Sequence, residues 1–366
     1  MSRKARWLAE WRKSAGKPVF YHVISRVVER RFAFGAEEKE KFRALMRLQE
    51  KFTGCRVVSY CLMCNHFHLL LEVPRMAEGG ISEEVLLKRL SAIYSDAFVA
   101  GVVKELADAR AVVYVNEGGL DEALAAIHKR FTYRMQDLGE FMKGLLQRFT
   151  QWFNRAHSRT GRLWEDRFKS VIVEDGVAAR TISAYIDLNP VRAGMMKDPA
   201  DYRWSSYGEA IGGGSKRNGR TARAGLVRAW GAHLGLAADS DQWAGEISRA
   251  YRKLLMGGAV EKRAEHVGRD GETVVKTLRK GISKEEALKD AQKDGEIPFG
   301  KILRCRVRYF TDGAVIGSRR FVDEAFVKSR ERFGPKRKTG ARKLKGEAGN
   351  AAGLLWSIRD LRKGIP

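Results

Sequence analysis

The sequence predicts an α+β fold of the ferredoxin-like kind, an antiparallel sheet with helices on one face, followed by a mostly helical, basic C-terminal region. A β-branched and aromatic run over residues 18–30 indicates a strand, and an amphipathic pattern over 36–53 indicates a helix. Two apolar runs over 57–62 and 67–73 then predict a β-hairpin. Strand, helix and hairpin in this order are typical of α+β domains.

The boundaries of these elements follow from turn and breaker residues. The helix over 36–53 is expected to stop at Gly54, and Pro74 is expected to end the hairpin. Several helical patterns then fill residues 75–150, which we interpret as a helical insertion. A short apolar run over 168–175 predicts a further strand.

The last part of the chain divides at a segment rich in glycine and basic residues. The helix predicted over 177–189 must end before Pro190. We interpret 211–224 as a linker, which leaves 1–210 as one domain and 225–366 as an accessory region. Within the accessory region we expect helices over 242–257 and 271–290 and a strand over 301–310.

Composition points to a nucleic acid partner. Among 366 residues, 69 Lys and Arg outnumber 44 Asp and Glu, for a net charge of +25, and such an excess is most often matched by nucleic acid, with an anionic membrane surface as the rival. No apolar stretch approaches the about 20 residues of a membrane span, and no secretion signal is visible. Four cysteines exclude a disulfide framework. We therefore expect a cytoplasmic, nucleoid-associated protein.

His66 and His68 lie on the second strand of the predicted hairpin. Side chains on a strand repeat every two residues, so both imidazoles leave the same face and could bind a divalent metal together. A pair of histidines that merely alternate is the plainer interpretation. A third interpretation adds Cys61 and Cys64 to form a closed zinc site, although that spacing is tighter than in zinc fingers.

Tyr185 and Asn189 are four residues apart on the helix before Pro190 and therefore share a helix face. A buried core tyrosine is the default interpretation. If this helix packs over the histidine strand, Asn189 could offer its carbonyl oxygen as a third metal ligand. Tyr185 could then act as a nucleophile whose phenol is acidified by the nearby dication.

Basic and aromatic residues mix in the turn before the strand at 168–175. Phosphate contacts combined with base stacking suit single-stranded DNA, and we expect both in this turn, from Arg155, Arg162, Trp164, Arg167 and Lys169. A second basic cluster, Lys336, Arg337 and Lys338, is expected to bind phosphates in the C-terminal region.

Four motifs occur in register: Asn65-His-Phe-His68, Gly161-Arg-Leu-Trp164-Glu-Asp-Arg167, Tyr185-Ile-Asp-Leu-Asn189-Pro-Val-Arg192, and Tyr202-Arg-Trp-Ser-Ser206. Together they resemble the REP-associated tyrosine transposases, single-tyrosine HUH nucleases related to small insertion-sequence transposases. The resemblance covers about residues 17–210. It implies an HUH catalytic core that cuts single-stranded DNA next to a hairpin.

The resemblance also implies roles for individual residues. His66 and His68, with Asn189, would hold Mg²⁺ or Mn²⁺, and Tyr185 would form a 5′-phosphotyrosine link, while Arg192 joins the DNA-binding set. Relatives commonly carry Gln where this chain has Asn189. A hairpin-DNA-binding or regulatory protein with a decayed site, a replication-initiating or conjugative nuclease, and a zinc-stabilised RNA-binding protein are the alternatives, and the protein could be a monomer or a homodimer.

Overall fold

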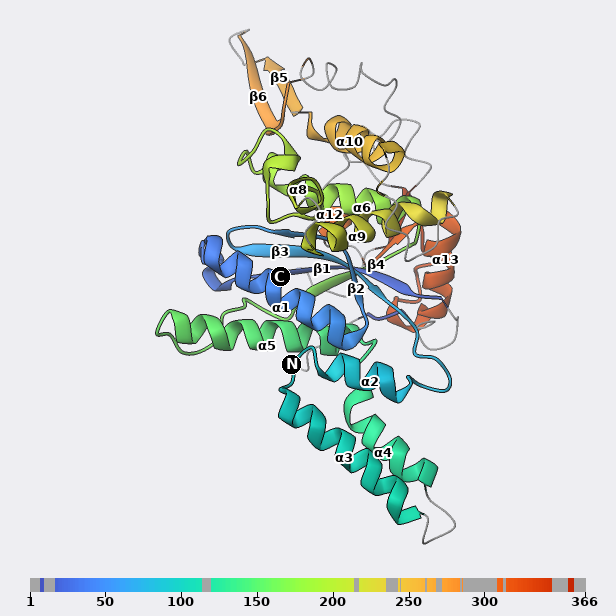
Figure 1. Ribbon diagram of the computed structural model, residues 1–366. Helices are drawn as coiled ribbons and strands as arrows, with labels where there is room; N and C mark the ends of the chain where they lie inside the picture. Colours follow the sequence, from blue (N-terminus) through green and yellow to red (C-terminus); the bar gives the residue numbers. More distant parts are fainter. Residues whose placement is uncertain are drawn as a thin grey trace.

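The computed structural model describes residues 7–9, 17–113, 120–213, 217–234, 243, 245–260, 262–267, 272–283, 285, 308–311, 314–343 and 355–358. A twisted sheet crosses the middle of the molecule, with helices above and below it (Figure 1). A helical arm extends from one side, and a two-stranded ribbon lies at the opposite end.

The central sheet has seven strands in the order β2-β3-β1-β4-β7-β9-β8. The pairs β2–β3, β1–β3 and β1–β4 are antiparallel, whereas β4 and β7 are parallel. The strands of this sheet are β1 (Val19–Arg26), β2 (Arg56–Leu62), β3 (His66–Val73), β4 (Lys169–Val173), β7 (Val315–Gly317), β8 (Arg342–Lys343) and β9 (Trp356–Ile358).

Helices cover both faces of this sheet. Below it in Figure 1 lie α1 (Ala36–Thr53) and α5 (Leu138–Ala156). Above it lie α6 (Val177–Asp187), α8 (Ser206–Gly212), α9 (Arg217–Leu234) and α10 (Gly245–Ala259). The expected α+β fold with an antiparallel core is confirmed, but the expectation of helices on one face only is wrong. The strands β1 and β3 carry apolar side chains toward both faces, so both must be covered to bury them.

The predicted local elements of the core are confirmed. Helix α1 spans the predicted residues, and Gly54 ends it in the left-handed region at φ 71°. The hairpin of β2 and β3 and the strand β4 also lie where the apolar runs predict them. Helix α6 ends at Asp187, and the short helix α7 (Asn189–Arg192) follows with Pro190 in its first turn.

The helical insertion forms an arm with its own small core. Helices α2 (Glu83–Leu90), α3 (Asp96–Val113) and α4 (Leu120–Thr132) project from the sheet (Figure 1). They bury a separate cluster that includes Leu86, Leu106 and Phe131. Helix α5, by contrast, packs on α1 beneath the sheet, so the last part of the predicted insertion belongs to the core.

The segment 211–224, predicted as a linker, contains the start of a packed helix. Helix α8 ends at Gly212 and α9 begins at Arg217. Helix α9 lies so close to β2 that a Cβ atom on Gly225 would sit 2.7 Å from the carbonyl oxygen of Val58. Within the predicted segment itself, a Cβ atom on Gly213 would lie 2.7 Å from the Cα atom of Gly219. The described part of the segment is therefore packed rather than an open linker, because glycine permits such a close approach.

In its described residues, the region after residue 225 combines helices with strands that were not expected. Beside α10, α12 (Arg308–Thr311) and α13 (Arg319–Lys328), it contains the ribbon β5 (Lys262–Val267) and β6 (Thr273–Arg279). The helix predicted over 271–290 is therefore wrong, since β6 occupies its first half. Most of the strand predicted over 301–310 lies outside the described residues. Strands β7, β8 and β9 extend the central sheet, so this region completes the core rather than standing apart from it.

The fourth sequence motif covers the free edge of β2. The Leu62 amide donates to the Trp204 carbonyl oxygen (3.0 Å), and the Tyr60 amide donates to Ser206 Oγ (2.8 Å). The Tyr202 hydroxyl donates to the Leu62 carbonyl oxygen (2.6 Å). An uncovered strand edge invites pairing with other chains, and this segment satisfies its hydrogen-bonding groups.

None of the helices in the described ranges combines the length and the apolar composition that crossing a bilayer requires.

Candidate active site

The histidine pair lies on the face of the sheet that α6 covers. In the antiparallel register of β1 and β3, Ile24 lies opposite His68 and Arg26 lies opposite His66. Residues directly opposite share a face. His22, two residues before Ile24, therefore also faces α6, and the rings of His66 and His68 lie 5.2 Å apart.

The three histidines are joined to their surroundings by short hydrogen bonds. His22 Nδ1 donates to the carbonyl oxygen of Phe310 (2.7 Å), a residue of α12. His22 Nε2 and His68 Nδ1 lie 3.0 Å apart, and His66 Nδ1 lies 2.7 Å from Asn65 Oδ1. A chain of contacts thus runs from the C-terminal region through His22 to the predicted metal ligand His68.

Burial keeps these imidazoles neutral. Removal from water lowers the pKa of His22 to about 4. Burial, assisted by the nearby charge of Arg26, also lowers the pKa of His66 to about 4. The pKa of His68 is lowered further, chiefly by burial and then by its histidine neighbours and by Arg26 and Arg192. Neutral imidazole is the form that ligates metals.

Tyr185 lies against the same histidines, as the predicted site requires. Its ring centroid is 5.7 Å from that of His68 and 5.8 Å from that of His22. The Phe310 ring packs against it at 4.8 Å, and the Arg192 guanidinium lies 4.9 Å from the ring centroid. The tyrosine is 2 % exposed. Helix α6 and strand β3 therefore bring the candidate nucleophile and the histidine pair together.

Asn189 follows α6 and turns its amide back onto that helix. Its Nδ2 donates to the carbonyl oxygens of Tyr185 (3.0 Å) and Ile186 (3.1 Å). Only Oδ1 then remains as a possible ligand atom. Imidazole nitrogen suits zinc, copper, iron and nickel, whereas a carbonyl oxygen suits magnesium and manganese. Within the described residues, no group of three or more His, Cys, Asp and Glu gathers as a metal site would.

The zinc interpretation is wrong. Cys61 and Cys64 are free thiols that do not gather with the histidines into a ligand cluster. Cys61 is fully buried and contacts the sulfur of Met63 at 3.7 Å. Cys64 lies 3.9 Å from Lys39 Nζ. The hairpin turn directs the two thiols to different neighbours, and burial raises the pKa of the Cys61 thiol.

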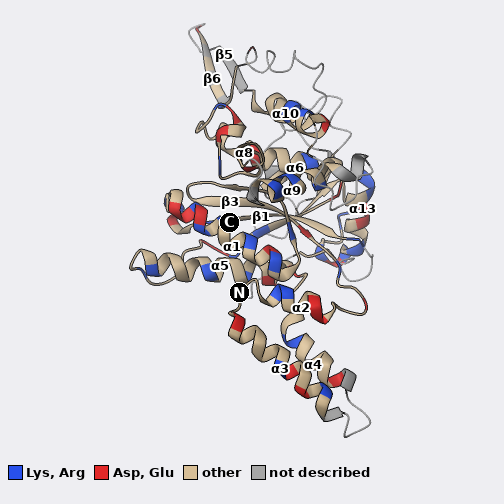
Figure 2. Ribbon diagram, viewed as in Figure 1, with Lys and Arg blue, Asp and Glu red and all other residues tan. Residues whose placement is uncertain are grey.

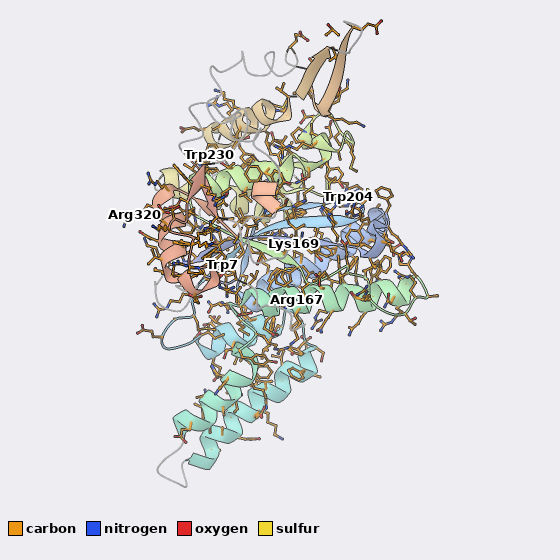
Figure 3. All side chains as sticks on the ribbon, turned by 180° about the vertical axis from the view of Figure 1, so that it is seen from behind. Trp7, Arg167, Lys169, Trp204, Trp230 and Arg320 are labelled. Carbon is orange, nitrogen blue, oxygen red and sulfur yellow. The ribbon has the colours of Figure 1, made fainter. Side chains whose placement is uncertain are left out.

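The basic residues of the turn before β4 lie on the surface as predicted. Arg155, Arg162, Arg167 and Lys169 are exposed. Figure 3 shows Arg167 and Lys169 at the entry to β4. Lys169 lies opposite Ile24, which lies opposite His68, so it shares the face and the row of the histidine site. It therefore lies about two strand spacings of about 4.8 Å from His68.

Trp164, a predicted stacking residue, is partly buried and joined to the core. Its indole Nε1 donates to Thr150 Oγ1 (2.9 Å), and its ring packs against an aromatic cluster. The members of that cluster within 6.3 Å of the ring are Phe34, Phe42, Phe67 and Phe149. These contacts anchor the turn to the core, and stacking of bases on Trp164 stays a prediction.

The second basic cluster is divided between surface and structure. Lys336 and Lys338 are exposed, as predicted. Arg337, however, donates to the carbonyl oxygens of Thr339 and Gly340, and its guanidinium lies 4.7 Å from the Phe333 ring centroid. These contacts support the loop, and a DNA contact of Arg337 stays a prediction. Lys and Arg residues are spread over helices of both halves of the chain (Figure 2).

The sequence analysis missed three residues of the site: His22, Arg26 and Phe310. His22 and Arg26 lie on the first strand at even spacing, so the alternation of that strand could have placed both beside His66 and His68. Phe310 is separated from His22 by 288 residues and carries no local signal of a role. It joins the site only through the tertiary fold.

Comparison with known proteins supports the family resemblance for one segment. Residues 17–93 match the family model described as transposase IS200 like. None of the curated proteins matches the chain. A solved REP-associated tyrosine transposase bound to a REP hairpin aligns over 68 % of this chain and 93 % of its own, at 12 % identity and a TM-score of 0.35. Residues 17–93, which hold β1, α1, the hairpin and both histidines, thus carry the sequence pattern of the IS200-like transposases.

Proposed function

We propose that this protein is a metal-dependent, single-stranded DNA nuclease and strand transferase that cuts next to a DNA hairpin through a 5′-phosphotyrosine intermediate. One observation carries the proposal: the Tyr185 ring lies 5.7 Å from the ring of His68, on the face of the sheet that α6 covers. The match of residues 17–93 to IS200-like transposases supports it.

The reaction requires one oxygen nucleophile and a leaving 3′-oxygen. The Tyr185 oxygen attacks the scissile phosphorus, the bond from phosphorus to the 3′-oxygen breaks, and the phenolic proton leaves for solvent while the 3′-oxygen takes one up. The products are a 5′-phosphotyrosine and a free 3′-hydroxyl, so no external energy source is needed for rejoining. Tyr185 and the free 3′-hydroxyl exchange roles in the reverse reaction.

His66, His68 and the Oδ1 atom of Asn189 are the residues that would hold Mg²⁺ or Mn²⁺. When bound, such an ion supplies Lewis-acid polarisation of the scissile phosphate. The two histidines meet the requirement for neutral imidazole ligands because burial holds the pKa of each well below 6.5.

Fixed positive charge favours a phosphate and a phenolate here. The Arg192 guanidinium lies 4.9 Å from the Tyr185 ring centroid, and Arg26 lies close enough to His66 to lower its pKa. A cation beside a phenol stabilises its deprotonated form. These two arginines therefore support both the binding of the scissile phosphate and the activation of the nucleophile.

Surface charge suits a DNA strand and its hairpin. Arg155, Arg162, Arg167 and Lys169 are exposed around the entry to β4, and Lys336 and Lys338 are exposed in the C-terminal region. With a net charge of +25, these residues favour the sugar-phosphate backbone. A DNA substrate agrees with a nucleoid-associated, cytoplasmic protein.

A covalent capture experiment tests the proposal. The full chain is incubated with a hairpin oligonucleotide carrying a single-stranded flank and Mn²⁺, and adducts are separated under denaturing conditions. We expect a band shift that requires the metal and disappears in Tyr185→Phe. Tyr207 is another buried tyrosine, and the control variant Tyr207→Phe should retain the shift. Absence of any adduct with tight hairpin binding would instead support a regulatory protein with a decayed site.

A further inference from the structure

The hydrogen-bond chain through His22 determines which nitrogen of His68 carries its proton. The carbonyl oxygen of Phe310 can only accept, so His22 Nδ1, 2.7 Å away, must donate to it. His22 is fully buried, and its hydrogen-bond partners here are a carbonyl oxygen and another imidazole, with no carboxylate to pair a buried positive charge. The ring is therefore neutral, and its Nε2 carries a lone pair. Because His68 Nδ1 lies 3.0 Å from that lone pair, His68 must donate from Nδ1. The lone pair of His68 is then on Nε2.

His66 reaches the same state through a separate contact. Asn65 Nδ2 donates to the carbonyl oxygen of Arg30 (3.0 Å), which directs Asn65 Oδ1 toward His66. His66 Nδ1 lies 2.7 Å from that oxygen and therefore donates to it. Both histidines of the pair thus present an unprotonated Nε2 and carry the proton on Nδ1.

We infer that His22 is a positioning residue that holds His68 in its ligating tautomer, and that the Phe310 carbonyl of α12 sets the orientation of His22. The inference rests on the proposed function only in that His68 serves as a metal ligand. The residue that hydrogen-bonds the other ring nitrogen of a ligating histidine selects the tautomer and the ring angle of that histidine. Here that partner is itself oriented by a C-terminal residue far beyond the segment 17–93.

Two substitutions at His22 separate positioning from packing. Gln carries a donor and an acceptor on one planar amide, so His22→Gln can donate to the Phe310 carbonyl oxygen and accept from His68 Nδ1. His22→Phe retains an aromatic ring of similar size but loses both hydrogen bonds. His157→Phe is the matched control, because His157 lies on the surface at the end of α5, paired with Glu38.

The first measurement needs no variant and no metal. Long-range ¹H–¹⁵N spectra of histidine side chains in the metal-free full chain report the tautomer of each ring. We expect His22, His66 and His68 all to carry the proton on Nδ1, with His68 changing its spectrum in His22→Phe. A proton on Nε2 of His68 in the wild-type protein would overturn the inference.

The second measurement is the affinity of the protein for Mn²⁺ in the absence of DNA. Electron paramagnetic resonance of the free ion reports how much Mn²⁺ remains unbound. Loss of the residue that accepts a hydrogen bond from a ligating histidine weakens metal affinity by about 10- to 100-fold. We expect this loss for His22→Phe. His22→Gln should restore most of the affinity, and His157→Phe should bind as the wild type does. Equal Mn²⁺ affinity in His22→Phe and wild type refutes the positioning role.

The outcomes distinguish the inference from the proposed function. If the tautomers and the Mn²⁺ affinities follow the expected order but no DNA adduct forms, the proposed function fails and the role of His22 stands. If adducts form while His22→Phe alters neither the His68 spectrum nor Mn²⁺ binding, the proposed function stands and the positioning role of His22 fails. If circular dichroism shows that His22→Phe does not fold, the tautomers of the wild-type protein and the Mn²⁺ affinity of His22→Gln test the inference instead.

Discussion

Arg228 of α9 offers a direct test of whether the region after residue 211 belongs to the core. Its Nε donates to Glu72 Oε1 on β3 (2.9 Å), and its two terminal nitrogens donate to the carboxylate of Asp175 after β4 (3.2 and 2.9 Å). The guanidinium also lies 4.8 Å from the Phe20 ring centroid. Arg228→Met keeps an unbranched apolar side chain at this position and removes the guanidinium with all three hydrogen bonds.

The expected cost follows from which carboxylate is left buried. The Glu72 side chain is 9 % exposed and keeps only Arg56, at 3.7 Å, among the ion pairs of the described residues. Breaking a buried ion pair costs about 3–5 kcal/mol. Asp175, 38 % exposed, can be solvated by water and adds little. We expect Arg228→Met to lower the free energy of unfolding by about 3 kcal/mol, at the low end because Arg56 remains.

Urea unfolding of the full chain, followed by far-UV circular dichroism, measures this loss. The double variant with Glu72→Gln removes the stranded charge, so it should recover about 1–2 kcal/mol of it. Arg320→Met serves as the control: the Arg320 side chain is 90 % exposed and pairs with Glu324 on its own helix, so its loss should leave the urea midpoint close to that of the wild type. A loss for Arg228→Met as small as that of Arg320→Met would refute the reasoning.

Three further predictions concern burial, reactivity and DNA contact. Phe310→Ala should lower the free energy of unfolding in urea by about 3–5 kcal/mol, because the ring is fully buried against Tyr185; a loss below about 1 kcal/mol would contradict its place in the core. Burial raises the pKa of the Cys55 thiol to about 12, so at pH 8 it is protonated, and mass spectrometry should show Cys64, which is partly exposed, alkylated first. Arg162→Ala should weaken binding of single-stranded DNA and reduce the slope of log affinity against log salt by about 0.7, as measured by fluorescence anisotropy. An unchanged slope would show that Arg162 contacts no phosphate.

Much of the fold around the candidate site could be predicted because its signals are local. The apolar and charged positions of α1 follow a helical period, and Gly54 supplies the left-handed residue that ends the helix. The alternation of β3 places His66 and His68 on one face whatever the rest of the chain does. The same holds for Tyr185 and Asn189, four residues apart along the chain.

The sequence could not predict the surroundings of a side chain where they depend on a distant neighbour. Trp164 and Arg337 carry the residue types of a DNA contact, yet one is packed among phenylalanines and the other supports a loop. Local sequence describes what a side chain can do but not which partners surround it. The glycines of 211–224 are a similar case, since flexibility and close helix packing use the same residue.

By itself the sequence determined the order of the core elements, the shared face of the two histidines and the candidate nucleophile, because strand and helix periods require only neighbouring residues. Only the tertiary structure decided that helices cover both faces of the sheet, that β7, β8 and β9 extend it, and that His22 and Phe310 complete the site. These features depend on pairing between segments as far as 288 residues apart. Such pairing is chosen by the burial of apolar surface and of backbone hydrogen-bonding groups over the whole chain, which no local period records.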